Sequence, residues 1–142
     1  LQAGLDLGAD VAVNYREGDV GEQVADATGG APVDVVIEAV GKPSVWRMIA
    51  SIVAPGARVA MTGLFAGATC DVDFDPLVVK EVAVLGCLGS PGMWPEAISL
   101  HNRGLVRAER IITHRMPLAE FADAIEISRS RKDGAIKVLL EP

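Results

Sequence analysis

The chain has 142 residues, of which 50% are apolar and 4% aromatic, and its 19 acidic and 13 basic side chains give a formal net charge of −6 at pH 7. This length and apolar fraction suffice for the core of one folded domain and exclude a disordered chain. The acidic balance argues against nucleic acid and against an anionic membrane surface as partners, and favours small ligands. Because no apolar run reaches the length of a membrane span, we expect a protein of the cytoplasm.

The two cysteines, Cys70 and Cys87, lie far apart in the sequence and form no C-x-x-C motif. They indicate free thiols, and support neither a disulfide framework nor a metal site. The acidic run from Cys70 to Pro76 lacks the glycine and the closing glutamate that a calcium loop of the EF-hand type requires. We interpret it as a solvated loop.

Strand-like apolar runs alternate with segments of helical period, which is typical of β-α units around a mostly parallel sheet. The first residues are expected to end a helix and to lead into a strand over 11–15. A helix is expected over 18–30, because Asp19 can cap it and Glu22 stands three residues later, as in a capping box. The glycine pair at its end can terminate it.

The next run, over 33–40, is almost continuously apolar, which indicates a central strand covered on both faces. Apolar side chains at helical spacing then predict a helix that includes Val53 and ends at the following Pro-Gly pair. Two further strands are expected over 58–64 and 82–89.

A helix is expected over 91–104, and the chain then changes to strand, helix and strand. Pro117 suits the first turn of this last helix, and from Leu118 its apolar residues recur at the spacing i, i+3, i+4, i+7. Basic residues fill its last turn, where the helix dipole favours cations, and Gly134 is expected to end it.

Several segments, in this order and at these separations, resemble the C-terminal portion of the zinc-type medium-chain alcohol and polyol dehydrogenases. They are LGADVAVNY, VDVVIEAVG, RVAMTGLF, VLGCLGS, IITHRMPLAEFADAIE and the terminal IKVLLEP. ITHRMPL with the terminal IKVLLEP favours the zinc-containing branch over the zinc-free quinone reductases. The resemblance implies an α/β fold: a partial Rossmann-type dinucleotide-binding domain with a doubly wound, mostly parallel sheet over residues 1–105. Residues 106–142 are then a C-terminal strand-helix-strand segment that returns to the catalytic domain.

In that family a GroES-like domain with the zinc ligands comes first, followed by a β-α-β unit with a glycine-rich turn. This chain contains neither G-x-G-x-x-G nor a Walker loop. We therefore expect a fragment, a truncated gene product or the ordered remainder of a longer protein, with the zinc ligands outside it. Two strands of the family's sheet would then be missing between the segments 11–15 and 33–40. The free edge of 33–40 either pairs with 11–15, recruits another chain, or leaves the chain marginally stable.

The resemblance places the cofactor, NAD or NADP, at the carboxyl ends of the parallel strands. The expected cofactor-binding residues are Ala39, Val40, Gly41, Thr62, Gly63, Leu64, Cys87, Leu88, Gly89 and Lys137. The backbone of the second and third groups would bind the nicotinamide carboxamide, and Lys137 would reach the pyrophosphate. Core or crevice packing is the alternative for the apolar residues, and a solvated surface charge for Lys137. No catalytic residue and no metal ligand is expected in this chain.

Glu38, His114 and Trp94 are weaker candidates. Glu38 could act as a general base, but a structural hydrogen bond is favoured. His114 has no metal-ligating or catalytic cluster around it in sequence, which favours a structural role at the entry to a helix. Trp94 could border a substrate crevice, although packing of a helix is the commoner use of such a residue.

Two functions follow from these observations. The first is a fragment of an NAD(P)-dependent, zinc-type alcohol or polyol dehydrogenase, in which zinc polarises a small alcohol and hydride passes to the nicotinamide. This chain would supply the nicotinamide-facing half of the cofactor site and would be inactive alone.

The second is a non-catalytic structural or dimerisation module. The family commonly forms dimers through the last strand of the nucleotide domain, so a homodimer or homotetramer is expected through the strand that begins at Val82 and ends at Leu88. An upstream reading frame with G-x-G-x-x-G and zinc ligands would favour the first function; the alcohol and the choice between NAD and NADP stay open.

Overall fold

The computed structural model describes residues 1–89 and 91–142, so Ser90, at the end of the segment VLGCLGS, lies outside the described residues. The chain divides into two compact units. One comprises Val13–Gly92, and the other combines Leu1–Ala12 with Met93–Pro142. The functional boundary expected after residue 105 stays a prediction.

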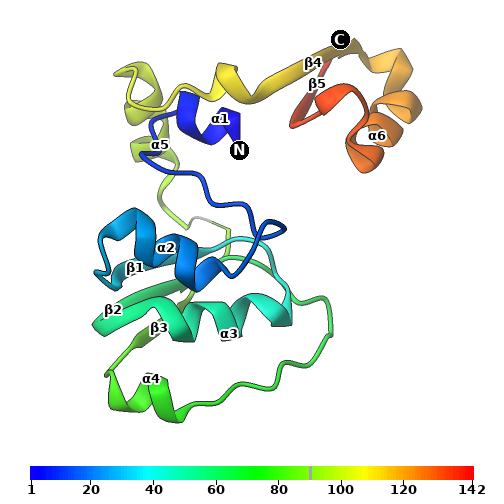
Figure 1. Ribbon diagram of the computed structural model, residues 1–142. Coiled ribbons are helices and arrows are strands. Elements are labelled where there is room, and N and C mark those ends of the chain that lie inside the picture. The colour runs from blue at the N-terminus through cyan, green and yellow to red at the C-terminus, as the bar shows by residue number, and fades with distance from the viewer. Residues whose placement is uncertain (90) are drawn as a thin grey trace. The chain divides into compact units, whose positions relative to one another are not determined.

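The unit Val13–Gly92 is built on a three-stranded parallel sheet in the order β1-β2-β3 (Figure 1). Its elements are α2 (Val20–Thr28), β1 (Val33–Glu38), α3 (Pro43–Ile52), β2 (Val53–Met61), α4 (Asp75–Val79) and β3 (Ala83–Gly86). The register places Val36 beside Val59, and Val59 beside Val84. The three adjacent parallel strands expected from the sequence are therefore confirmed, as is the α/β fold.

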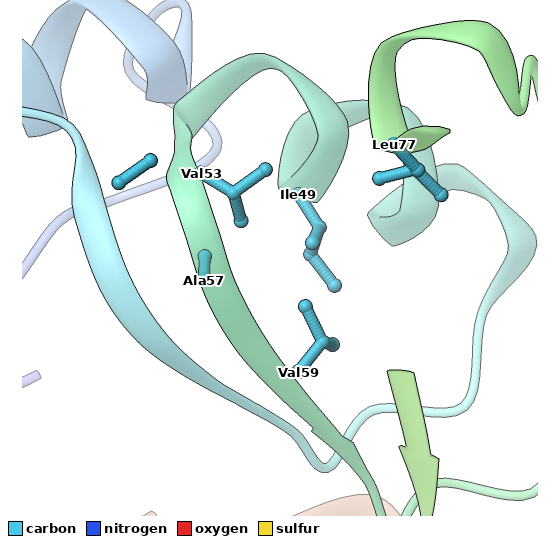
Figure 2. Packing of buried hydrophobic residues seen from close by; sticks show 6 residues of the cluster. Ile49, Val53, Ala57, Val59 and Leu77 are labelled. Atoms are coloured by element: carbon cyan, nitrogen blue, oxygen red, sulfur yellow. The ribbon is translucent and has the colours of Figure 1, made fainter. Parts of the chain in front are cut away.

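The hydrophobic core of this unit lies on one face of the sheet. Val59 of β2 is wholly buried, and Ile49 of α3 and Leu77 of α4 belong to the same buried cluster (Figure 2). On the opposite face Ile37 of β1 is 71% exposed and Leu85 of β3 is half exposed. The helices thus cover the face that carries Val59, because alternate side chains of a strand point to opposite faces.

The expectation that β1 is a central strand covered on both faces is wrong for the described residues. β2 is the central strand, and β1 lies at an edge of the sheet with β2 as its described neighbour. A continuous apolar run shows which residues a strand can bury, but it does not specify how many neighbours the strand has.

Residues 11–15, expected as a strand, form none in the structure. Asn14 instead organises a turn: its side-chain oxygen accepts from the N–H of Arg16 at 3.1 Å and its carbonyl accepts from the N–H of Glu17 at 3.0 Å. The carbonyl of Asn14 also accepts from the side-chain amide of Gln23. A strand needs a neighbour for its backbone groups, whereas an Asn side chain offers a local alternative. The pairing of 11–15 with β1, one of the arrangements expected, does not occur.

Helix α2 forms as expected. The carboxylate of Asp19 accepts from the N–H of Glu22 at 3.0 Å, which caps the helix, and Gly29 ends it in the left-handed conformation with φ of 64°. Helix α3 ends at Ile52, before the Pro-Gly pair that was expected to end it, because Val53 and this pair already belong to β2.

The end of α3 is stabilised by Lys80, which the sequence did not indicate. Its half-buried side chain donates to the carbonyl oxygens of Ala50 at 3.3 Å and Val53 at 2.9 Å. A charged donor thereby satisfies carbonyls that a helix end leaves without an intrahelical partner. Helix α4 was not expected, because it begins at Asp75, inside the run that was interpreted as a loop.

The other unit confirms the expected strand-helix-strand order. β4 (Ile112–Pro117) and β5 (Lys137–Glu141) form a two-stranded parallel sheet and are connected through α6 (Phe121–Ser130). The unit also holds α1 (Gln2–Asp6), α5 (Trp94–Asn102) and the short 3-10 helices Ala108–Ile111, Leu118–Glu120 and Lys132–Gly134. Within the described residues, no helix is long and apolar enough to cross a membrane.

Two boundaries in this unit differ from expectation. Pro117 ends β4 instead of starting α6, and its extended backbone, with ψ of 144°, suits a strand end. Helix α6 ends at Ser130, earlier than the end expected at Gly134, because Arg131 already adopts the left-handed conformation. Arg107 and Arg110 connect the separated pieces of the unit by donating to the carbonyls of Leu7 and Asp6.

Candidate functional site

Three turns meet at one edge of the sheet in the unit Val13–Gly92. They comprise residues 39–41 after β1, 62–64 after β2 and 87–89 after β3. Because the strands are parallel and adjacent, their carboxyl ends lie side by side. The structure therefore brings together all expected site residues except Lys137, which begins β5 in the other unit.

Hydrogen bonds between neighbouring segments continue beyond the ends of the strands. The N–H of Thr62 donates to the carbonyl of Glu38 at 2.8 Å, and the N–H of Cys87 donates to the carbonyl of Met61 at 2.8 Å. The hydroxyl of Thr62 also donates to the carbonyl of Glu38, at 2.9 Å. The turns are consequently fixed to the ends of the strands.

Among the described residues, Glu38 is the one buried polar side chain, with 3% of its surface exposed. Its Oε1 atom accepts from the N–H groups of Val40 and Gly41, each at 2.8 Å. The structural hydrogen bond favoured for Glu38 is therefore present. Its Oε2 atom is buried and has no hydrogen-bond partner among the described residues.

The first two turns approach each other so closely that they leave no room for side chains at two glycines. A Cβ on Gly41 would lie 2.9 Å from the N and C atoms of Leu64, and a Cβ on Gly63 would lie 2.7 Å from the Cα of Gly41. Gly41 also has a φ of 69°, a conformation that favours glycine. The sequence indicated these glycines as strand ends, but it carried no signal for their mutual contact.

Apolar side chains border this edge and are exposed. Leu64 is 71% exposed, Leu88 is 74% exposed, and Val40 is also largely exposed. The main chains of Leu64 and Leu88 form no hydrogen bond with the described residues. The edge thus offers exposed apolar surface, which suits one face of a flat ring.

A pocket of this unit lies elsewhere. It is lined by Trp46 and Ala50 of α3 and by Val72 and Pro76 of the following segment, and it contains none of the three turns. This pocket is therefore distinct from the candidate site.

The described residues do not fit a metal site. They contain no group of three or more His, Cys, Asp or Glu side chains that could hold a metal ion. Cys70 and Cys87 are free thiols, as expected. In the other unit His114 contacts the hydroxyl of Thr113 at 2.9 Å, and Trp94 begins α5 with 69% of its surface exposed.

Comparison with known proteins gives the family of the chain. A family model described as zinc-binding dehydrogenase matches residues 1–103. Sorbitol dehydrogenase from Halalkalibacterium halodurans is 32% identical over 143 aligned positions, which cover 100% of this chain and 41% of that protein. This chain therefore spans about two fifths of the length of such relatives.

Solved structures agree with this assignment. An alcohol dehydrogenase from E. coli CFT073, complexed with NADH, is 26% identical with a TM-score of 0.90 over 99% of this chain and 41% of its own. A protein from Sinorhizobium meliloti 1021, described as a zinc-binding dehydrogenase and solved with NADP, is 28% identical with a TM-score of 0.88, covering 99% and 42%. The expected resemblance is thereby confirmed, and the chain belongs to the family of zinc-binding dehydrogenases.

Proposed function

We propose that this chain supplies the nicotinamide-facing half of the cofactor site in an NAD(P)-dependent dehydrogenase that acts on a small alcohol or polyol. The main support for this proposal is that the turns 39–41, 62–64 and 87–89 meet at one edge of the sheet. Similarity to a sorbitol dehydrogenase and to structures that hold NADH and NADP supports the proposal. When bound, the nicotinamide accepts or donates the hydride.

In this proposal the chain binds and orients the nicotinamide ring. The exposed side chains of Val40, Leu64 and Leu88 provide the apolar surface against which one face of the ring packs. Backbone N–H and C=O groups of Leu64 and Leu88 bind the carboxamide, which needs both acceptors and donors. Lys137 is assigned to the cofactor pyrophosphate, for which its flexible ammonium group is suited.

Zinc is implied by the family name, but the described residues offer no set of ligands for it. No step of the reaction is therefore assigned to a metal held by this chain. Its proposed contribution is confined to binding and orienting the cofactor.

NMR titration of the 142-residue chain tests the cofactor site. Nicotinamide mononucleotide should shift the backbone amide signals of residues 39–41, 62–64 and 87–89, whereas AMP at the same concentration should leave them in place. The two probes separate the nicotinamide half of the cofactor from its adenine half. Shifts by AMP alone, or by neither nucleotide, would contradict the proposal.

We also propose that the chain forms a two-fold dimer, whether or not it takes part in catalysis. The dimer would form along the side of β3 that faces away from β2. β3 is an edge strand of the described sheet, and Val84 is 42% exposed. Because the N–H of Cys87 points to β2, strand alternation directs the N–H of Val84 to the open edge. Antiparallel pairing with a second copy would give these outward groups partners.

A proline at residue 84 tests this edge. Val84→Pro removes the outward N–H but leaves the donors that face β2, so it should convert the dimer to a monomer while the fold persists. Val84→Ala keeps the N–H and is the matched control, for which sedimentation analysis should still show a dimer. A monomeric wild-type chain, or a dimer that survives Val84→Pro with its fold intact, would refute this interface.

We further propose that the protein works in the cytoplasm. Its two cysteines are free thiols, which is usual in a reducing compartment. Fractionation of the source cells with an antibody to the chain should recover it with cytoplasmic markers, and recovery with an oxidising compartment would contradict this assignment.

A further inference from the structure

We propose that Glu38 is a positioning residue of the candidate site, whose carboxylate couples the turn 39–41 to the turn 62–64. The inference rests on the cofactor-binding function proposed above for these turns. It assigns no proton transfer to Glu38 and places no atom of this side chain on the cofactor. The buried side chain of Glu38 keeps the two cofactor-facing turns in fixed positions relative to each other.

Glu38 is bonded to both turns through different groups. Its side-chain Oε1 accepts from Val40 and Gly41 of the first turn, whereas its main-chain carbonyl accepts from the N–H groups of Thr62 at 2.8 Å and Gly63 at 3.1 Å. A substitution of the side chain removes the first set of bonds and leaves the acceptor of the second set unchanged. The two contributions can therefore be separated by experiment.

The second carboxylate oxygen provides the link between the turns. Oε2 lies so close to Gly63 that a Cβ on this glycine would come within 2.5 Å of it. The carboxylate thus occupies the space between Gly63 and the amides of the first turn. Oε2 is buried and accepts no hydrogen bond from the described residues, so it meets Gly63 by close contact alone.

Amide hydrogen exchange tests the coupling without any cofactor. Glu38→Ala should raise the exchange rates of Val40 and Gly41 about tenfold through loss of their acceptor, and should raise those of Thr62 and Gly63 by a similar factor. Glu38→Gln keeps a carbonyl oxygen at the position of Oε1 and should hold all these rates within about threefold of the wild type. Faster exchange confined to Val40 and Gly41 would overturn the coupling, as would a Gln variant that behaves like the Ala variant.

Cofactor affinity provides the functional readout. Glu38→Ala should weaken binding of NADH about tenfold and Glu38→Gln less than about threefold, because only the first variant releases the turns. Val59→Ala, a core substitution outside the site, is the control for general loss of stability and should leave the affinity of the folded protein unchanged. An Ala variant that binds NADH like the wild type would refute the positioning role. If the wild type itself binds no NADH, the proposed function fails, while the exchange rates still decide whether Glu38 couples the turns.

Discussion

Gly63 has no room for a methyl group between the first two turns of the site. The Cβ added by Gly63→Ala would lie 2.5 Å from Oε2 of Glu38 and 2.7 Å from the Cα of Gly41, where ordinary contacts begin at 3.4 Å. One turn must therefore move by about 1 Å, and the obstructing atoms include backbone that cannot rotate away. Gly63 does not have a positive φ, so the expected cost is purely steric.

We expect Gly63→Ala to lower the free energy of unfolding by about 3 kcal/mol, at the upper end of the usual range for overpacking. Gly86→Ala is the matched control, because Gly86 lies at the end of β3, has no atom of the described residues within 4 Å of the added Cβ and does not have a positive φ. Its unfolding free energy should be unchanged or rise by up to about 1 kcal/mol, since alanine restricts the unfolded chain.

Urea unfolding followed by circular dichroism measures both variants against the wild type, with a common dependence on denaturant. The steric reasoning would be refuted if Gly63→Ala stayed within about 0.5 kcal/mol of the wild type, the usual range for harmless surface changes. Equal losses in the two alanine variants would also refute it, because the control has free space around the added methyl group.

Three further substitutions test the packing of the same unit by urea unfolding. Val59→Ala should cost about 2–3 kcal/mol because the side chain is wholly buried, whereas Val79→Ala, at an 82% exposed position, should cost less than about 0.5 kcal/mol. Lys80→Met should cost about 2 kcal/mol, because it removes the charged donor to the carbonyls of Ala50 and Val53 while keeping most of the apolar stem. A loss below about 0.5 kcal/mol for Lys80→Met would show that these two bonds do not stabilise the end of α3.

The order and direction of β1, β2 and β3 could be predicted because each strand carries its own apolar run and a segment of helical period separates β1 from β2. Helix α4, between β2 and β3, was not predicted. The strand expected over 11–15 could not form alone, because a strand depends on a neighbour that local composition does not reveal. The error at Pro117 has a similar origin: proline suits both a strand end and a first helical turn.

The edge that carries the candidate site could also be predicted, since it follows from where parallel strands end. The arrangement within the edge could not. The register between β1 and β2 determines that Glu38 bonds to both turns. It also determines that Gly41 and Gly63 each lie against the other turn. Sequence spacing locates a glycine at a strand end, but contact between two turns appears only once the strands are aligned.

In the proposed function the nicotinamide ring packs at the edge formed by the three turns. Nuclear Overhauser effects between the ring protons of nicotinamide mononucleotide and the methyl groups of this chain test it most directly. We expect contacts to Val40, Leu64 and Leu88, whose side chains border the edge. Contacts confined to the pocket beside Trp46, or an absence of contacts at saturating ligand, would contradict it.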